Sequence, residues 1–350
     1  MDKTKQTILI IRTSAMGDIV MSSHLAEGLR SRYPDARICW LAEPQVAPLL
    51  EHNPALDAVI VWPKMRWKEL LRTRQWGPLL REVRDFIVRL RSERFSLAID
   101  AQGLLRTRLL AWLSGARERV GFVSRELGQF LMTRLLAKGE GSRLMGSEYF
   151  YLLQQLGVTT THLRQRIDLA PASTAAAAEC LASVGVSAGY VVFAPFTTRP
   201  QKHWFDQRWV ELAQAMTLQS GLPVVWLGGP ADRQHAERLA SAGGGIPLAG
   251  TTSLAVSAAL VAGASLVIGV DTGLTHLGSA FDVPTVALFG ATCPYSSTCS
   301  ERTIVLYHPL PCSPCRRSPS CEGNFDCMQA LTVAEVMQAA ERICQVRHQV

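Results

Sequence analysis

A polar segment in the carboxyl-terminal half has the composition of an anion site. Gly269–His276 places Asp271, Thr272 and Gly273 after an apolar run and at the start of a helical pattern. The free N–H groups of a helix start attract anions, and the helix dipole adds roughly 0.3–2 kcal/mol. His276, in the first helical turn, is either a further ligand contact or an ordinary packed histidine. The segment is therefore a candidate binding site for an anionic ligand.

Two further segments in this half also follow apolar runs. Phe196–Trp204 contains Thr197, Thr198 and Lys202, whose hydroxyl and ammonium groups suit a diphosphate, although an ordinary polar loop has the same composition. Gly228–Asp232 combines glycines that allow close approach with a carboxylate suited to ribose hydroxyls. Each segment is a weak signal alone. Three of them at the carboxyl ends of strands in one half predict a nucleotide site.

The amino-terminal half has a polar turn of its own, Thr13–Asp18, between a short apolar run and a helical pattern. Gly17 permits a tight turn, and Asp18 falls at the helix start. Asp18 is therefore either a helix-capping residue or a carboxylate base. The turn is not G-x-G-x-x-G, so the dinucleotide fingerprint is absent. Its absence weakens the hypothesis of a nicotinamide-dependent oxidoreductase.

Four cysteines near the carboxyl terminus are spaced like a metal loop, though not in the usual pair of C-x-x-C motifs. Three states remain open for them: a structural zinc, reduced thiols or disulfides. A catalytic metal has less support, because no Asp-x-Asp pair occurs in the chain. The four residues are Cys312, Cys315, Cys321 and Cys327.

The positive charge is concentrated in one segment. The chain carries a net charge of +7, and residues 64–119 hold 14 basic and 6 acidic residues, a net charge of +8. Such a segment is either a solvated helix face or a dock for an anionic partner, and the concentration favours the dock. Together with the cysteine loop, it motivates an alternative function, a nucleic-acid-binding protein with a basic helix and a zinc loop. The aromatic residues nearby form no recognised stacking motif for nucleic acid.

Apolar runs alternate with helical patterns along both halves, which is typical of parallel strands in doubly wound sheets. In the first half we expect strands at 8–11, 37–41, 58–62, 97–99 and 120–122, with helices at 18–33, 67–91 and 104–113. In the second half we expect strands at 190–194, 224–227, 266–270, 285–289 and 303–307, with helices at 209–219, 232–242, 253–261 and 273–281. At 350 residues and 48% hydrophobic composition, the chain is long enough for two such α/β domains.

We assign residues 1–170 and 171–330 to the two domains, and 331–350 to a carboxyl-terminal helix that packs across their junction. Thr332 and Glu335 form a capping box at the start of that helix. The uncharged stretch 239–270 is long enough to span a bilayer, but glycines and a proline interrupt it. We interpret it as a loop, a short helix and a buried strand. With no secretory signal, we expect a cytoplasmic protein.

These motifs together resemble those of the ADP-heptose:lipopolysaccharide heptosyltransferases, glycosyltransferase family nine. The resemblance rests on Thr13–Asp18, Asp100–Gly103, Thr197–Trp204 and Asp271–His276, and it runs from about Ile8 to Ile343. It implies a GT-B fold, in which two Rossmann-like doubly wound domains face each other across a cleft. It also implies inverting, metal-independent transfer of heptose from ADP-heptose to the Kdo/heptose inner core of lipopolysaccharide. Asp100–Gly103 is most similar to heptosyltransferase I, which adds the first heptose to Kdo on lipid A.

The resemblance also implies a role for individual residues. Asp18 matches the general base, and Lys202 stabilises the departing ADP. The implied donor-binding residues are Gly17, Thr197, Thr198, Lys202, Asp232, Thr252, Asp271, Thr272, Gly273 and His276. The implied acceptor-binding residues are Lys64, Arg66, Lys68, Asp100 and Gln102.

The implied partners are an ADP-heptose donor and an anionic acceptor, Kdo-lipid A or the inner core. The resemblance implies no cofactor for catalysis and no nucleic acid. Because the acceptor is a lipid, we expect the protein in the cytoplasm, in peripheral contact with the cytoplasmic face of the inner membrane.

Overall fold

The chain forms two compact α/β units in the computed structural model, which describes residues 6–137, 139, 143–292, 295–315 and 318–345. Unit 1 comprises Met1–Ser142 and Gly146–Asp168, and unit 2 comprises Arg143–Met145 and Leu169–Val350. The main division, between residues 168 and 169, lies close to the boundary at 170 and 171 expected from the sequence.

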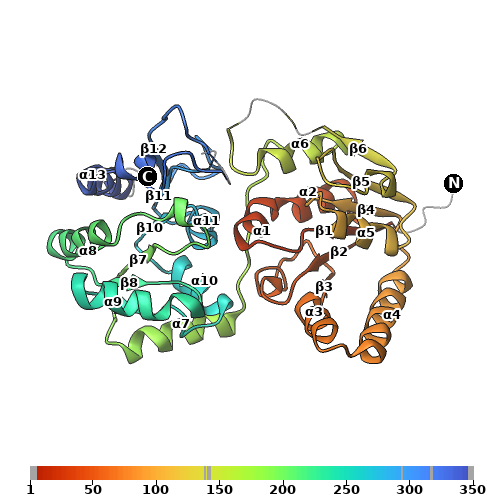
Figure 1. The fold of residues 1–350 in the computed structure, drawn as a ribbon, viewed down its shortest axis with the longest axis horizontal. Helices are drawn as coiled ribbons and strands as arrows, with labels where there is room; N and C mark the ends of the chain where they lie inside the picture. Colours follow the sequence, from red (N-terminus) through yellow and green to blue (C-terminus); the bar gives the residue numbers. More distant parts are fainter. Residues whose placement is uncertain (1–5, 138, 140–142, 293–294, 316–317, 346–350) are drawn as a thin grey trace. The chain divides into compact units, whose positions relative to one another are not determined.

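Unit 1 contains a parallel six-stranded sheet with the strand order β3-β2-β1-β4-β5-β6 (Figure 1). The central strand β1 pairs with β4 so that Ile11 lies opposite Asp100. The carboxyl ends of these two strands therefore meet at one edge of the sheet. The strands are β1 (Thr7–Ile11), β2 (Arg37–Ala42), β3 (Ala58–Val61), β4 (Leu97–Asp100), β5 (Glu118–Phe122) and β6 (Arg134–Leu136).

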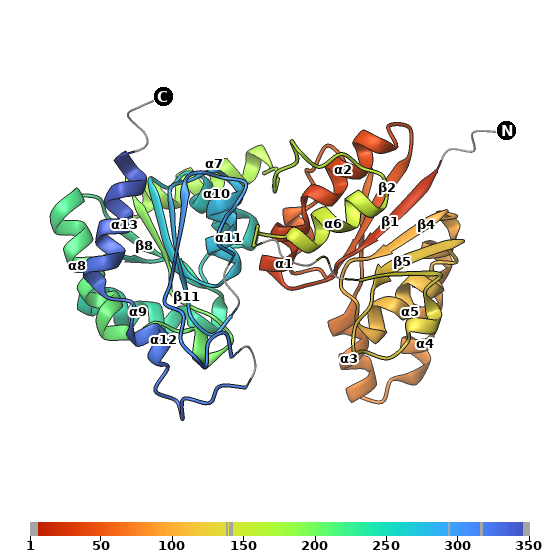
Figure 2. The ribbon, with the colours of Figure 1, turned by 90° about the horizontal axis from the view of Figure 1, so that it is seen from above.

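Helices cover both faces of this sheet. Figure 2 shows α3, α4 and α5 on one side and α2 and α6 on the other. On the first side, Phe86, Leu90 and Leu110 pack against the strand residues Leu9 and Cys39. The α-helices are α1 (Met16–Ser22), α2 (His24–Arg32), α3 (Lys64–Arg72), α4 (Trp76–Ser92), α5 (Leu105–Leu113) and α6 (Ser147–Gln155), and the short 3₁₀ helices are η1 (Ala47–Leu49) and η2 (Gln129–Leu131).

Unit 2 contains a second parallel six-stranded sheet, with the order β12-β11-β10-β7-β8-β9. Its first and fourth strands, β7 and β10, lie side by side as β1 and β4 do in unit 1, with Gly269 opposite Ala194. Both sheets therefore have the same topology. The strands are β7 (Val191–Ala194), β8 (Val224–Trp226), β9 (Ile246–Pro247), β10 (Leu266–Val270), β11 (Thr285–Phe289) and β12 (Thr303–Tyr307).

Two groups of helices flank the second sheet (Figure 2). Trp209 and Leu212 of one helix and Val336 and Ile343 of another bury against the strands on one face. The elements are α7 (Pro171–Ser183), α8 (Asp206–Ser220), α9 (Arg233–Gly243), α10 (Leu254–Ala262), α11 (Gly273–Ala280), α12 (Asp326–Gln329), α13 (Val333–Gln345), η3 (Pro200–Lys202) and η4 (Pro230–Asp232).

The carboxyl-terminal helix α13 belongs to unit 2. Its start is as predicted, because Thr332 Oγ1 accepts a hydrogen bond of 3.2 Å from the backbone N–H of Glu335. Its apolar stripe, however, belongs to the core of unit 2, where Val336, Ala339 and Ala340 are buried. The helix therefore completes the core of unit 2, and the expected packing across the junction stays a prediction.

The uncharged stretch 239–270 folds as the sequence predicts. It contains the end of α9, the two-residue strand β9, the helix α10 and the buried strand β10. Among the described residues, no helix has both the length and the apolar composition needed to cross a bilayer.

Candidate functional site

Asp18 lies in the first turn of α1, directly after the carboxyl end of β1. Its Oδ2 accepts a hydrogen bond of 3.3 Å from the N–H of Ala15, and the same oxygen forms an ion pair with Arg12. The capping interpretation is thus correct in part, since the carboxylate satisfies a backbone N–H at the helix start. The side chain nevertheless remains 36% exposed, so that a second partner can reach it.

Arg12 is a site residue that the sequence analysis missed. Its guanidinium is almost fully buried, and it donates a hydrogen bond of 3.1 Å to the carbonyl oxygen of Ala101, after β4. The other end of the same group meets Asp18. Arg12 therefore ties the catalytic candidate to the neighbouring strand, and its position at the end of β1 was the available signal.

A hydrogen-bond network joins the ends of β1, β2 and β4. Gln102 Oε1 accepts bonds from the backbone N–H and the hydroxyl of Thr13, at 3.0 and 2.9 Å. Glu43 Oε1 lies 3.3 Å from the same hydroxyl and accepts a hydrogen bond of 2.9 Å from Lys64 Nζ. Glu43 was not predicted, although it also follows a strand directly. The network places Gln102 and Lys64, two predicted acceptor residues, at the edge that carries Asp18.

The remaining predicted acceptor residues lie in different surroundings. Arg66 is exposed and pairs with Glu82 at 3.3 Å, and Lys68 is exposed on α3. Asp100 has no exposed surface, and its Oδ1 accepts the backbone N–H groups of Gln102 and Gly103 at 3.0 Å each. Burial raises the pKa of Asp100. We therefore correct the expectation of a direct acceptor contact: Asp100 shapes the turn that presents Gln102.

Asp271 is the centre of the corresponding site in unit 2. Its Oδ2 lies 2.5 Å from Lys202 Nζ and accepts a hydrogen bond of 2.6 Å from the hydroxyl of Thr292. Its Oδ1 lies 3.1 Å from Nε2 of His276. Burial alone would raise the pKa of Asp271, but the hydrogen bond from His276 and the charge of Lys202 hold it well below its usual range. The carboxylate is therefore ionised and fixed by three side chains.

His276 connects Asp271 to a second buried residue. Because the ionised carboxylate accepts, Nε2 of His276 donates, and Nδ1 lies 2.9 Å from the hydroxyl of Tyr295. Burial raises the pKa of Tyr295 far above its ordinary value, so the phenol stays protonated and donates a hydrogen bond to Nδ1. Tyr295 and Thr292 were both missed by the sequence analysis, although they follow the carboxyl end of β11.

Close packing against the end of β10 fixes the start of α11. Thr272 is the residue that precedes the helix, and Gly273 is buried in its first turn. The hydroxyl of Thr275 donates a hydrogen bond of 2.7 Å to the carbonyl oxygen of Val270. A Cβ atom at Gly269 would collide with that hydroxyl, so glycine is required there. The helix start is thereby held next to Asp271.

The other predicted donor residues follow neighbouring strands of the same sheet. Thr197 and Thr198 lie in the loop after β7, where the ring Nε2 of His203 is 2.8 Å from the carbonyl oxygen of Thr197. Asp232 Oδ2 accepts a hydrogen bond of 2.8 Å from the N–H of Gly229, after β8. Thr252 shares a hydroxyl hydrogen bond of 2.7 Å with Ser257 at the start of α10. Gly17 is the exception, because it lies in unit 1 beside Asp18.

The four predicted cysteine ligands form a loop around the end of β11. All four are unbridged, and in the part of the chain that the structure describes no three His, Cys, Asp or Glu side chains are grouped to hold a metal ion. Cys315 Sγ lies 3.9 Å from the carbonyl oxygen of Ala291, and Cys327 Sγ packs close to Gly290. The loop therefore contacts the segment that leads to Thr292.

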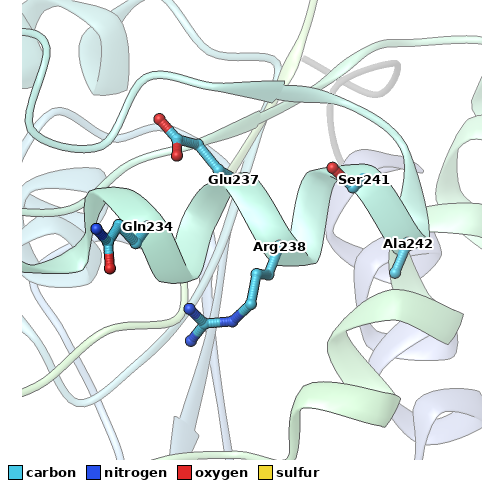
Figure 3. A pocket seen from close by; sticks show the side chains of 5 residues that line it. All are labelled: Gln234, Glu237, Arg238, Ser241 and Ala242. Atoms are coloured by element: carbon cyan, nitrogen blue, oxygen red, sulfur yellow. The ribbon is translucent and has the colours of Figure 1, made fainter.

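Figure 3 shows a surface depression of about 540 Å³ on one side of α9. It contains none of the predicted site residues, and its side chains form no group with obvious chemistry. The lining residues are Gln234, Glu237, Arg238, Ser241 and Ala242.

Comparison with known proteins identifies the family of the chain. The sequence profile of glycosyltransferase family 9 (heptosyltransferase) matches residues 83–325. The chain is 30% identical over 321 residues to lipopolysaccharide heptosyltransferase 1 of Pseudomonas aeruginosa, an alignment that covers 88% of this chain and 85% of that protein. The chain belongs to glycosyltransferase family 9 and is a glycosyltransferase.

Solved structures agree with the fold of the two units. A family 9 glycosyltransferase from Veillonella parvula superposes with a TM-score of 0.83 at 24% identity, covering 99% of both chains. The Escherichia coli heptosyltransferase WaaC with ADP-2-deoxy-2-fluoro heptose superposes with a TM-score of 0.71 at 26% identity, covering 96% of this chain and 99% of that one. The predicted α/β, GT-B fold class is therefore confirmed, and the family favours a glycosyltransferase over the oxidoreductase and nucleic-acid alternatives.

Proposed function

We propose that this protein transfers heptose from ADP-heptose to the inner core of lipopolysaccharide with inversion at the anomeric carbon. The observation that carries the proposal is the buried cluster of Lys202, Asp271 and His276 at the carboxyl edge of unit 2. A cation held by an ionised carboxylate beside a helix start suits a diphosphate. Relatives named lipopolysaccharide heptosyltransferase 1, and a solved relative that holds an ADP-heptose analogue, support the choice of donor and acceptor.

The donor contacts follow from where each side chain lies. Lys202 and the backbone N–H groups of Thr272 and Gly273 bind the diphosphate, with Thr197 and Thr198 adding hydroxyl donors. Asp232 Oδ1 accepts from the ribose hydroxyls, while its Oδ2 stays on Gly229. The remaining donor residues are Gly17, Thr252, Asp271 and His276.

The chemical step needs a proton acceptor, and Asp18 takes that role. Its carboxylate removes the proton of the acceptor hydroxyl while that oxygen attacks the anomeric carbon. A new C–O bond forms, the bond from the anomeric carbon to the phosphate oxygen breaks, and ADP leaves with the electron pair. A positioned base of this kind contributes about 10²–10⁴-fold to the rate.

Negative charge grows on ADP as the bond breaks. Lys202 and the first-turn amides of α11 stabilise that charge in the proposed mechanism, which therefore uses no divalent metal. The four-cysteine loop does not take part in this step, and a structural zinc at Cys312, Cys315, Cys321 and Cys327 is one of the states that the sequence leaves open.

The acceptor is an anionic, lipid-linked sugar in this proposal. Lys64, Arg66 and Lys68 attract its charge, and Gln102 contacts the sugar near Asp18. Such an acceptor places the enzyme in the cytoplasm, at the inner face of the inner membrane.

Measurement of ADP release tests the proposal. The enzyme is supplied with ADP-heptose and with Kdo-lipid A, and separately with a core that already carries one heptose. We expect rapid ADP release with Kdo-lipid A only, together with a product heavier by one heptose. Release that does not depend on the acceptor would indicate hydrolysis, and preference for the heptose-bearing core would move the enzyme to a later step. No release with either acceptor would contradict the proposal.

A further inference from the structure

The exposed apolar side chains of this protein are distributed unevenly. Among the described residues, thirteen large hydrophobic side chains are exposed, and eleven of them lie between Met65 and Phe130. The other two are Val184 and Leu218 in unit 2. Single exposed apolar residues are ordinary, but a concentration within one part of one domain marks an interaction surface.

Five of these side chains gather on α5 and the neighbouring 3₁₀ helix. Leu105, Leu109 and Trp112 are spaced i, i+4 and i+7 along α5, so they share one face of the helix, and each is 43–46% exposed. Leu127 is 76% exposed and Phe130 is 85% exposed. A Cβ atom at Gly128, between them, would lie 2.7 Å from Leu105, so this loop packs beside α5. We name these five residues the α5 patch.

The protein holds the loop of the α5 patch in place. Arg108 is a residue of α5 and is fully buried, and its Nη1 donates to the carbonyl oxygens of Glu126 and Leu127 at 2.7 and 2.8 Å. Its Nη2 donates to the carbonyl oxygen of Phe122 at 3.0 Å and to Ser124 Oγ at 2.9 Å. One buried side chain thus fixes the backbone that displays Leu127 and Phe130, so their exposure is a built feature of the fold.

Positive charge surrounds the α5 patch. Residues 64–119, which include α3, α4 and α5, carry 14 basic and 6 acidic residues, and these three helices lie on the same side of the sheet (Figure 2). Close to the patch in sequence, four arginines are exposed against two exposed glutamates. The arginines are Arg106, Arg117, Arg125 and Arg134, and the glutamates are Glu118 and Glu126.

We propose that the α5 patch docks this protein on an anionic lipid membrane. Apolar and aromatic side chains on one face of a helix enter the interface between headgroups and acyl chains, and neighbouring arginines bind the anionic headgroups. Each basic residue near such a surface strengthens the attraction. The charge favours a membrane over a second copy, because a symmetric dimer through this patch would bring the same positive segment of both copies together.

The inference rests on the proposed function in one respect, the lipid-linked acceptor. The α5 patch begins at Leu105, three residues after Gln102, so it starts at the sheet edge that carries the predicted acceptor contacts. A membrane beneath the patch would therefore lie next to the edge where the sugar of a lipid-linked acceptor is needed.

Sedimentation with vesicles tests the inference without acceptor or donor. The full chain is mixed with phosphatidylethanolamine vesicles that contain phosphatidylglycerol, and with vesicles of phosphatidylcholine alone. We expect binding to the anionic vesicles, weakened by salt, and little binding to the neutral ones. The double variant Leu127→Ser/Phe130→Ser should bind at least about tenfold more weakly, since it loses two large apolar side chains that would be buried in the membrane.

Leu218→Ser is the matched control, because Leu218 is 90% exposed on α8 in unit 2 and lies outside the patch. It should bind vesicles like the wild type. Equal binding by the double variant and the wild type would overturn the inference, as would no binding to anionic vesicles. Dimerisation that depends on concentration and is lost in the double variant would also overturn it, because the patch would then serve a second copy.

A soluble acceptor separates this inference from the proposed function. With a delipidated Kdo oligosaccharide, the double variant should keep the wild-type rate of ADP release while its vesicle binding is lost. If neither the wild type nor the double variant releases ADP, but vesicle binding still depends on the patch, the proposed function is contradicted and the docking surface is still supported. Loss of activity on the soluble acceptor in the double variant alone would overturn docking as the role of the patch.

Discussion

Lys202 Nζ lies 2.5 Å from Asp271 Oδ2 and 3.3 Å from the backbone oxygen of the same residue. The ammonium group is thus held at the start of α11. A buried ion pair of this kind is costly to break by removing one partner, because the other charge is left uncompensated. Asp271 therefore fixes the position of Lys202, and the remaining hydrogens of the ammonium group can be donated to a diphosphate.

Replacement of Lys202 tests the diphosphate contact. We expect Lys202→Ala to weaken ADP binding about 10- to 100-fold, since a charge-assisted hydrogen bond is worth about 1.5–3 kcal/mol. Titration calorimetry with ADP measures the effect. Lys202→Met/Asp271→Asn is the control, because it removes both buried charges. If that double variant regains stability and also regains ADP affinity, the lysine acts on Asp271 alone and does not bind phosphate.

Replacement of Asp18 tests the catalytic base. Asn keeps an oxygen that can accept from the N–H of Ala15, so Asp18→Asn should fold normally and bind ADP like the wild type. Without a proton acceptor, kcat should fall about 10²–10⁴-fold. Steady-state rates of ADP release and the dissociation constant for ADP are both measured. A variant that keeps turnover near the wild-type value would exclude Asp18 as the base.

Tyr295 should act as a positioning residue through His276. In Tyr295→Phe the ring stays but the donor to Nδ1 is lost, and the hold of His276 on Asp271 weakens. One hydrogen bond is worth about 0.5–1.5 kcal/mol, so KM for the donor should rise about two- to tenfold while kcat changes less. The thermal midpoint of unfolding serves as the structural control. An unchanged KM would show that Tyr295 only fills space.

His24 should make the stability of unit 1 depend on pH. It is buried and stacks on Phe150 with ring centroids 3.8 Å apart, and burial lowers its pKa from 6.5 to about 3. Below pH 6.5, His24 takes up a proton in the unfolded state but stays neutral in the native state. The contribution is therefore complete above pH 6.5 and is lost at about 1.4 kcal/mol per pH unit as the pH falls toward 3.

His24→Phe keeps the stacked ring and removes the titration. Denaturant unfolding of both proteins at pH 7.5 and pH 5 should show a drop of about 2 kcal/mol in the wild type and a smaller one in the variant. The titration of Asp271 does not affect the difference in unfolding free energy between pH 7.5 and pH 5. Its low pKa makes its own contribution fade only below the ordinary aspartate pKa of about 3.9. An equal drop in both proteins would exclude His24 as the source.

A chelator distinguishes a catalytic metal from a structural one. The proposed mechanism uses Lys202 and backbone amides, so excess EDTA should leave the initial rate of fresh enzyme unchanged. A prompt loss that Mg²⁺ restores would contradict it. Slow unfolding under the chelator, with zinc released from the cysteine loop, would instead establish a structural metal there.

The strand ends that carry chemistry could be predicted from the sequence, because each polar turn interrupts an apolar run. Breaks between consecutive helices were harder to predict. The predicted helix over 67–91 is two helices, α3 and α4, separated where Arg74 adopts φ 56°. Gly77 and Pro78 in the first turn of α4 were the overlooked signal for its start. The predicted helix over 18–33 also breaks, where the hydroxyl of Ser23 bonds back to the carbonyl oxygen of Val20.

The sequence analysis missed Tyr295 for a physical reason. Tyr295 lies 19 residues beyond its partner His276 along the chain, and only folding brings the two together. Asp100 was misjudged for the opposite reason, since a carboxylate at a strand end has the same sequence pattern whether it is buried or exposed. Local pattern therefore predicts which edge of a sheet is functional, but not which of its side chains reach the ligand.

Each unit has an aspartate near the end of the fourth strand of its sheet, because Asp100 is the last residue of β4 and Asp271 is the first residue after β10. The backbone N–H groups of Gln102 and Gly103 donate to Asp100, and burial raises its pKa. A lysine and a histidine contact Asp271, and its pKa moves downward. The fourth strand of each sheet thus leads to an aspartate, which shapes a turn in unit 1 and supplies a fixed negative charge in unit 2. The groups that contact each aspartate therefore set the chemical difference between the two units.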